Sequence, residues 1–415
     1  IMKRIAIFHP NLGIGGAERL IIDIALALKR KGNEVTVFTN HHDKTHCFCE
    51  TKEDLNIVCS FDWIPDSILG CFKVYLAALK AFLLTIYFLI FYYGSFELVL
   101  VDQISVIAVP FLRLFNFPVI FYCHFPDQFL TDRKTFIKKL YRYPIDKIEV
   151  FCALISNKVL VNSNFTCDVV INSFPIIKNK YLSNPNWIKV VYPCVPENLC
   201  KFVENDDKCH NSNDDEEKYL FLSINRYDPK KLIQRSIIAM KLLEDKLDSY
   251  HWFKTRLIIM GGCDPLSRID NEYFQFLKDL AHSYGLIGND NPENDKISFL
   301  KNPSDDLKFS ILKKATSLIY TPDNEHFGIV PIEAMLMSVP VITSASGGPL
   351  ETVIDGVTGF HIKDFPSELA SKMQYIIENS QKTEEMGKAA FKHCNQKFTI
   401  LSLEKNIEEV LQEFK

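Results

Sequence analysis

The chain has 415 residues, which is long enough for two or three domains, and its 47% hydrophobic and 24% charged residues exclude a disordered protein. A net charge of -4 argues against a broad nucleic-acid surface, which needs clustered basic residues. The 12 cysteines show no repeated spacing, so we predict free thiols in a reducing compartment rather than a disulfide framework.

The first half of the chain alternates strand and helix signals. Residues 3–8 predict a strand, a glycine turn follows, residues 17–31 predict a helix, and residues 34–39 predict a second strand. Met2, Lys3 and Arg4 lead directly into the first strand, so we expect no cleavable secretory signal. Further strands are predicted at 98–102, 119–123, 158–163 and 188–193. This alternation is typical of a parallel sheet with helices on both faces.

Residues 81–93 form an uncharged, apolar segment between two of these strands. The segment is short for a helix that spans a membrane, and a span would place strands of one sheet on opposite sides of the bilayer. We therefore predict a helix that packs on the sheet and exposes an apolar face to a membrane surface, with Lys73 and Lys80 toward the lipid headgroups. An entirely buried core helix is the alternative.

Residues 204–218 have almost no apolar content and predict an acidic, polar linker. A second α/β alternation follows, with strands predicted at 219–225, 256–262, 296–300, 317–322 and 340–344. We therefore predict an α/β fold of two doubly wound, Rossmann-like domains that face each other across a cleft. The expected domains are residues 1–203 on the acceptor side and 219–397 on the nucleotide-sugar side, with a terminal helix at 398–415 that packs back across the cleft.

Glu325 and Glu333 lie eight positions apart, the first in a turn-like stretch and the second just inside a predicted helix. Carboxylates accept hydrogen bonds from vicinal hydroxyls, so the two acids could hold two different sugars, one of them a ribose. The start of the helix offers free N–H groups to a diphosphate, which together indicates a nucleotide-sugar site. A solvated loop acid and a helix-capping acid are the alternative. The donor-binding residues predicted between the acids are Phe327, Gly328, Ile329 and Val330.

Arg226 and Lys231 follow the predicted strand at 219–225 directly. They can converge on a diphosphate, the guanidinium as a bidentate fork and the ammonium as a point charge. Lys230 stands beside them, and the pattern does not decide which lysine binds phosphate. The alternative is a basic surface turn, but the two acids at the same rim of the sheet favour a donor site.

Gly13, Gly15 and Gly16 form a glycine turn after the first strand. The spacing does not fit G-x-G-x-x-G, because Glu18 stands at the last position, and the second strand ends without the acid that would hold an adenosine ribose. An NAD site is therefore disfavoured. Backbone N–H groups of such a turn can still approach a diphosphate or an acceptor.

Asp102 and His124 close two other strands at the same rim of the first domain. His124 can donate a hydrogen bond to a transferring sugar or orient an acceptor, whereas the alternative is a satisfied structural histidine. Asp102 is predicted to take part on the acceptor side.

Together these residues resemble the GT-B glycosyltransferases of family 4, and among them the eukaryotic mannosyltransferases that act on dolichol-linked oligosaccharides. The likeness rests on LGIGGAERL, VDQ, FYCHFPD, VNSNFT, LSINRY, TPDNEHFGIVPIEAM and SGGPLE, which are spread over almost the whole chain. It implies a retaining transfer of α-1,3- and α-1,6-linked mannose from GDP-mannose to a one-mannose, dolichol-diphosphate-linked oligosaccharide, giving the three-mannose species. It also implies work at the cytosolic face of the endoplasmic reticulum membrane, no essential metal or other cofactor, and further mannosyltransferases of the pathway as candidate partners.

The resemblance also implies roles for single residues. Arg226 and Lys231 match the family's donor-diphosphate pair, Glu325 the acid at the donor sugar and Glu333 the acid at the ribose. In the first domain, Gly15 and Gly16 match the loop near the diphosphate, and His124 matches the histidine beside the donor sugar.

One position departs from the family pattern. Leu232 stands where the family typically has Asn, which leaves the choice between Lys230 and Lys231 open. The alternatives that share the fold are transfer from another nucleotide sugar, transfer to a phosphatidylinositol acceptor, and a non-catalytic membrane scaffold.

Overall fold

The computed structural model describes residues 2–68, 72–130, 135–206, 219–288 and 295–414, which form two compact units. The first unit consists of residues 1–194 and 400–415, and the second of residues 195–399. The division falls ahead of the predicted boundary at residue 203, because α9 (Glu197–Asp206) packs in the second unit, where the rings of Phe202 and Phe309 are in contact. The predicted linker lies outside the described residues from 207 onward.

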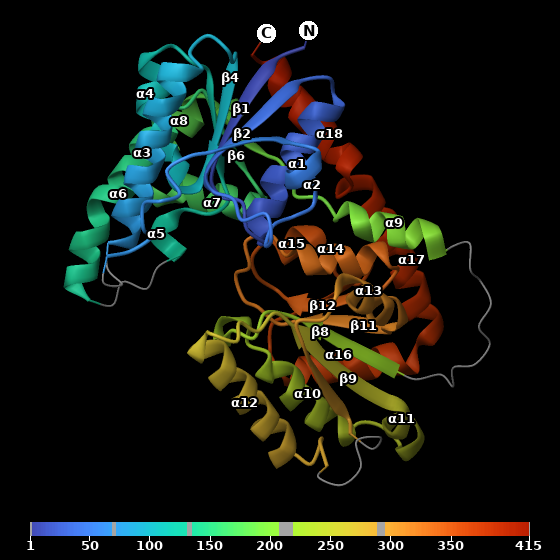
Figure 1. The fold of residues 1–415 in the computed structure, drawn as a ribbon. Coiled ribbons are helices and arrows are strands. Elements are labelled where there is room, and N and C mark those ends of the chain that lie inside the picture. Colours follow the sequence, from blue (N-terminus) through green and yellow to red (C-terminus); the bar gives the residue numbers. More distant parts are fainter. Residues whose placement is uncertain (1, 69–71, 131–134, 207–218, 289–294, 415) are drawn as a thin grey trace. The chain divides into compact units, whose positions relative to one another are not determined.

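The first unit is built on a seven-stranded parallel sheet of order β3-β2-β1-β4-β5-β6-β7 (Figure 1). Strands alternate with helices along the chain and pair in parallel, as predicted, but the short β3 was not predicted. Phe8 pairs with Val101 and Asp102 with Tyr122, so the carboxyl ends of β1, β4 and β5 lie side by side. The strands are β1 (Arg4–Asn11), β2 (Glu34–His41), β3 (Asn56–Cys59), β4 (Leu98–Asp102), β5 (Val119–Cys123), β6 (Lys158–Val161) and β7 (Ile188–Val190).

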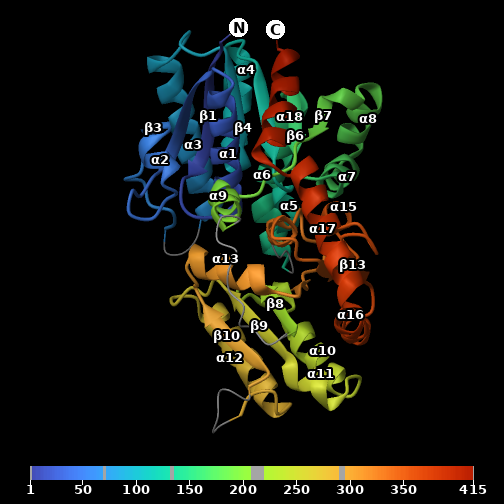
Figure 2. The ribbon, with the colours of Figure 1, turned by 90° about the vertical axis from the view of Figure 1, so that its right-hand side faces the viewer.

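Helices cover both faces of this sheet (Figure 1). The C-terminal helix α18 packs on α1, with Leu403, Ile407 and Val410 in the same core cluster as Leu20 and Ile24, and it runs along the first unit in Figure 2. The helices and 3-10 turns are α1 (Gly16–Arg30), α2 (Glu50–Glu53), α3 (Lys73–Phe91), η1 (Gln103–Ala108), α4 (Val109–Leu114), α5 (Asp127–Leu130), α6 (Phe136–Ile155), α7 (Asn164–Ser173), α8 (Pro175–Ser183), η2 (Pro185–Trp187) and α18 (Ile400–Gln412).

The apolar helix α3 is buried on one face only. Phe88 packs in an aromatic cluster with Phe8 and Phe38, at ring-centroid distances of 5.2 and 5.1 Å. Ile90 and Phe91 are exposed on the other side, so the alternative of an entirely buried core helix is wrong. By length and composition alone, α3 is also apolar enough to cross a membrane.

The second unit holds a six-stranded parallel sheet of order β10-β9-β8-β11-β12-β13. Both sheets reverse their strand order, at β1/β4 and at β8/β11, which confirms the two predicted doubly wound domains. The strands are β8 (Tyr219–Ile224), β9 (Thr255–Gly261), β10 (Ile297–Lys301), β11 (Ser317–Tyr320), β12 (Val341–Ser344) and β13 (Gly359–Ile362), the last of which was not predicted. The helices and the 3-10 turn are α9, η3 (Pro229–Lys231), α10 (Gln234–Glu244), α11 (Ser249–Lys254), α12 (Arg268–Ser283), α13 (Asp305–Lys314), α14 (Ile329–Leu336), α15 (Pro349–Thr352), α16 (Ser367–Glu378) and α17 (Ser380–Lys397).

Candidate functional site

The predicted donor residues of the second unit gather where its strand order reverses. Arg226 and Lys231 follow β8, and Glu325 follows the neighbouring strand β11. Ligands of open α/β sheets bind outside the carboxyl ends of the strands at this switch point. The fold therefore brings the basic pair and the first acid to the position where such a sheet binds its ligand.

Lys231 and Glu325 form the central ion pair of this site. The Lys231 Nζ lies 2.5 Å from Glu325 Oε2, and both side chains are partly buried. The turn η3 fixes the lysine, because Asp228 accepts a hydrogen bond from the Lys230 N–H at 2.9 Å and Thr321 donates to the Lys231 carbonyl at 2.6 Å. The ion pair offsets the free-energy cost of partly burying the Lys231 ammonium group, which would be high without an acid beside it.

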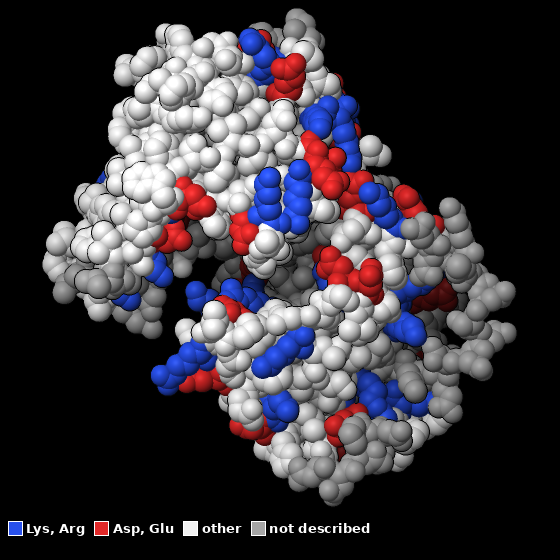
Figure 3. Space-filling model, in the orientation of Figure 1, with Lys and Arg blue, Asp and Glu red and all other residues white. Residues whose placement is uncertain are grey.

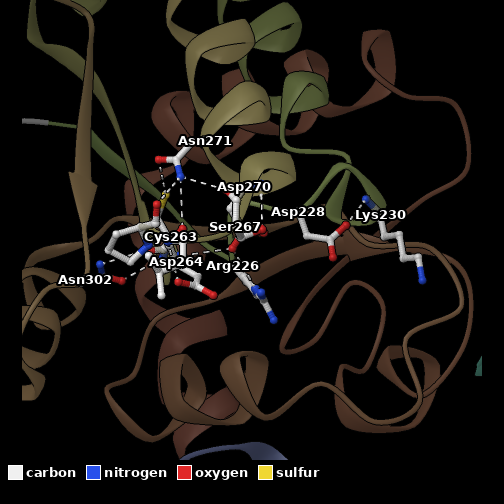
Figure 4. A network of polar contacts seen from close by, with 11 residues as sticks. Arg226, Asp228, Lys230, Cys263, Asp264, Ser267, Asp270, Asn271 and Asn302 are labelled. Carbon is white, nitrogen blue, oxygen red and sulfur yellow. Dashed lines mark hydrogen bonds and ion pairs between the residues drawn. The ribbon is translucent and has the colours of Figure 1, made fainter. Parts of the chain in front are cut away.

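Lys230 lies apart from this ion pair. Its side chain is exposed and extends away from the polar network around Arg226 in Figure 4. The structure thus brings Lys231, and not Lys230, together with Glu325.

Leu232 ends this turn in the left-handed region, with φ of +53°. This conformation is costly for a leucine, whereas Asn tolerates it better than other residues that carry a Cβ. An Asn would therefore suit this turn, and Leu232 adopts the same backbone shape at a higher conformational cost.

Arg226 is anchored at one nitrogen and exposed at the others. Its Nε lies 3.1 Å from Asp270 Oδ2, while the side chain is 57% exposed and its tip points away from the acid (Figure 4). Burial alone would raise the pKa of Asp270, but hydrogen bonds from Ser267 and the Asp264 N–H, together with Arg226, lower it. An ionised Asp270 holds the arginine stem and leaves its terminal N–H groups for an anion.

The loop that carries Glu325 is held by two neighbouring segments. Arg235 binds Asp323 with two hydrogen bonds of 2.9 and 2.7 Å, and Ser344 donates to the same carboxylate at 2.6 Å. The Gly348 N–H donates to the Glu325 carbonyl at 2.7 Å. Sequence reasoning missed Arg235 and Asp323, because only the folded sheet places them together.

Gly348 allows the closest approach in this loop. A Cβ at Gly348 would lie 2.4 Å from the Phe327 Cα, so only glycine fits beside that backbone. Gly328, which precedes α14, has φ of +87°, a conformation that glycine adopts without strain. The two glycines set the path of the chain from Glu325 into the helix.

Glu333 lies inside α14 and is only 4% exposed. Lys308 of α13 approaches both of its oxygens, with its Nζ 2.9 Å from Oε1 and 2.7 Å from Oε2. Tyr320 lies near both acids, since burial and then the Glu325 and Glu333 carboxylates raise its pKa well above the ordinary value. Lys308 was missed because a lysine in an amphipathic helix carries no motif.

The candidate residues of the first unit form a second cluster. His124 Nε2 lies 2.8 Å from Asp102 Oδ2, so the structure brings these two predicted residues together. Gly15 caps α1 and Gly16 begins it, and the Glu18 side chain folds over Gly15, where an added Cβ would lie 2.2 Å from Glu18 Oε2. His9 also contacts Asp102, although its place inside a strand gave no signal in the sequence.

Within the described residues, cysteines are free thiols, as predicted, and no group of three or more His, Cys, Asp or Glu side chains is arranged to hold a metal ion.

Two family models match the chain. Residues 14–193 match "Glycosyltransferase Family 4", and residues 204–393 match "Glycosyl transferases group 1".

Relatives named alpha-1,3/1,6-mannosyltransferase ALG2 are similar over nearly the whole chain. The protein of Dictyostelium discoideum is 36% identical over 98% of this chain and 97% of its own length, and that of Homo sapiens is 37% identical over 94% and 91%. The protein of Saccharomyces cerevisiae is 35% identical over 99% and 85%.

Solved structures with the same fold are glycosyltransferases with low sequence identity. Sucrose-phosphate synthase from Thermosynechococcus elongatus superposes with a TM-score of 0.73 at 18% identity, covering 99% of this chain and 98% of that one. Anabaena Alr3699/HepE in complex with UDP and glucose gives a TM-score of 0.71 at 18% identity, covering 99% and 100%. These likenesses show that the two Rossmann-like units form a GT-B fold.

Proposed function

Because the chain belongs to the α-1,3/1,6-mannosyltransferases of glycosyltransferase family 4, we propose that it takes mannose from GDP-mannose and adds it to a dolichol-diphosphate-linked oligosaccharide. Family membership makes it an α-1,3/1,6-mannosyltransferase with a nucleotide-sugar donor and a glycan acceptor. The identity of the nucleotide and of the lipid is our proposal. The single observation that carries the donor site is the Lys231–Glu325 ion pair at the β8/β11 switch point, beside the anchored Arg226.

In this proposal the diphosphate binds between Arg226, Lys231 and the N–H groups at the start of α14. Lys231 then exchanges part of its contact with Glu325 for phosphate oxygen, and the carboxylate becomes available to hydroxyls of the mannose. Glu333 accepts from the ribose hydroxyls, and Lys308 pairs with this buried acid. The support is the arrangement of charges: Arg226 and Lys231 both follow β8, Lys231 pairs with Glu325, and Glu333 lies in the helix that begins after the same loop.

The departing GDP gains negative charge as the bond to mannose breaks. Arg226 and Lys231 stabilise that charge more in the transition state than in the ground state, which raises the rate. We propose that these cations provide the counter-charge without an essential metal. We also propose a retaining reaction by same-face substitution, in which the departing phosphate helps to deprotonate the acceptor hydroxyl as the new glycosidic bond forms.

Product analysis tests this function. The purified chain is incubated with a one-mannose dolichol-diphosphate acceptor or a phosphatidylinositol acceptor, and with either GDP-mannose or a UDP-sugar. The products are cut with linkage-specific mannosidases. We expect α-1,3- and α-1,6-linked mannose from GDP-mannose only. Turnover of a UDP-sugar or of a phosphatidylinositol acceptor would favour a related transferase, and absence of any turnover by folded protein would favour a scaffold.

We also propose that the first unit lies on the membrane surface through α3 and α6. On α6 the spacing of Phe136, Leu140, Tyr143 and Phe151 places four exposed apolar side chains on one helix face. The two helices are neighbours, since the Tyr75 hydroxyl of α3 donates to the Tyr141 carbonyl of α6 at 2.7 Å. The visible face over α3 and α4 is broadly uncharged in Figure 3.

The membrane proposal predicts a specific loss of binding. The double variant Ile90→Glu, Phe91→Glu is expected to lower co-sedimentation with phospholipid vesicles at least tenfold, because each buried apolar side chain contributes about 1.5–3 kcal/mol. Leu266→Glu is the matched control, since Leu266 is 95% exposed in the second unit. Equal binding of both variants and the parent would refute this surface.

A further inference from the structure

A buried cluster of two histidines and one aspartate lies at the carboxyl ends of three neighbouring strands in the first unit. Asp102 of β4 is fully buried, and its oxygens lie 2.9 and 2.8 Å from the Nδ1 of His9, which follows Phe8 in β1 and is also fully buried. Its Oδ2 also lies 2.8 Å from the Nε2 of His124, just after β5. One carboxylate is therefore shared by two imidazoles.

The chemistry of the carboxylate assigns the protons at these contacts. An ionised carboxylate only accepts hydrogen bonds, so both facing nitrogens carry a hydrogen, His9 at Nδ1 and His124 at Nε2. For His124 the remaining ring nitrogen is Nδ1, and in the neutral ring Nδ1 is an acceptor. Whether His124 accepts or donates at Nδ1 depends on which of the two histidines carries the positive charge that balances Asp102.

The surroundings favour the charge on His9. Its Nε2 lies 4.0 Å from the Glu18 carboxylate at the start of α1, which is too long for a hydrogen bond but close enough for electrostatic attraction. Burial lowers the pKa of His9, but Asp102 and then Glu18 outweigh it, and the net shift is upward. The pKa of Asp102 shifts down, because His9 and His124 outweigh the effect of burial.

The groups around His124 are different in kind. The Tyr122 ring lies at a centroid distance of 4.9 Å, and the Tyr122 hydroxyl donates to the Val191 carbonyl. Asn162 donates to the His124 backbone carbonyl at 2.9 Å. Among these neighbours, Asp102 is the acid that faces the His124 ring, whereas His9 lies between two acids.

We propose that His9 is a positioning residue that balances the charge of Asp102, so that His124 stays neutral and presents Nδ1 as an acceptor for a hydroxyl of the reacting sugars. The inference rests on the proposed mannosyl transfer and on the role near the sugars that the family resemblance implies for His124. Without the charge on His9, Asp102 recruits the proton to His124 instead. The imidazolium then donates at Nδ1, and the hydrogen bond to the substrate hydroxyl has the wrong polarity. In serine proteases, loss of the aspartate that sets the histidine's hydrogen positions is enough to lower kcat about 10⁴-fold.

The test uses His9→Gln in the full chain with GDP-mannose and the lipid-linked acceptor. We expect kcat at neutral pH to fall about tenfold to hundredfold, with a much smaller change in KM for GDP-mannose. The acid limb of the pH–activity profile should move to higher pH by about one unit, because the variant lacks the like charge that opposes protonation of the second imidazole. The ¹⁵N resonances of His124 should report the neutral Nε2–H form in the parent and imidazolium in the variant at the same pH.

A second variant keeps the test valid if His9→Gln folds poorly. Glu18→Gln removes the outer acid without changing the buried ring, and it should shift the same profile in the same direction by a smaller amount. An unchanged profile and unchanged His124 resonances in both variants would overturn the inference, even if activity fell with the folded fraction. Failure of the proposed function differs from this, because the parent chain would then not use GDP-mannose at all.

Discussion

Lys231→Ala is expected to lower kcat/KM for the sugar donor about 10²–10³-fold, as for loss of one preorganised group that stabilises transition-state charge. Two effects add. The variant removes the cation that we propose to lie beside the departing diphosphate, and it leaves the Glu325 carboxylate without its Lys231 partner. The measurement is steady-state turnover of GDP-mannose, with thermal unfolding to confirm that the variant is folded.

The matched control is Lys230→Ala, one position away. Lys230 is exposed and contributes its backbone N–H, not its side chain, to the turn at Asp228, so we expect kcat/KM within about twofold of the parent. Equal losses for the two alanine variants would contradict the assignment of Lys231. Full activity of Lys231→Ala would remove the basis of the donor site.

Gly348→Ala should be the more damaging of two single-methyl changes in the second unit. Gly348 has φ of -58° and ψ of -33°, which alanine adopts readily, so the backbone conformation itself does not oppose the change. The added Cβ would lie 2.4 Å from the Phe327 Cα and 2.6 Å from the His326 carbonyl, both on the loop that carries Glu325. Overpacking of this kind costs about 1–3 kcal/mol, and a displacement of about 1 Å at Glu325 lowers activity about 10²-fold.

Gly262→Ala is the control for this second variant. A Cβ at Gly262 meets no atom within 4 Å, so the same methyl group should leave both Tm and turnover close to the parent values. Measuring both quantities separates unfolding from misplacement of Glu325. A Gly348→Ala variant with normal turnover would show that the loop yields without moving the acid.

Much of the fold follows from local pattern alone. Strands such as β4 and β5 are buried and apolar apart from Asp102 at the end of β4, and their bounds match the predicted ones. The strand β13 was missed because GFHI is too short and mixed to stand out from a loop. The boundary between the units was placed too late because α9 is polar in sequence, and only packing on α13 assigns it to the second unit.

Some residues of the candidate site could be predicted from the sequence, and others could not. Glu325 and Glu333 stand out because of their spacing, whereas the choice between Lys230 and Lys231 depends on the turn η3, which no periodicity predicts. Lys308 contacts Glu333, 25 positions away in the chain, and His9 contacts Asp102, 93 positions away. Such contacts exist only once the sheets are formed. Single-sequence reasoning finds residues that share a short motif and misses those that support them from other elements.

The packing of α18 on α1 sets an order of events during synthesis. Ribosomes make the chain from residue 1 onward, and the first unit takes its last helix from residues 400–412, after the whole second unit has been translated. In the finished protein Leu403 and Ile407 cover an apolar surface of α1, so this surface is exposed in the nascent chain until α18 has been made. Cells commonly rely on chaperones at such a stage.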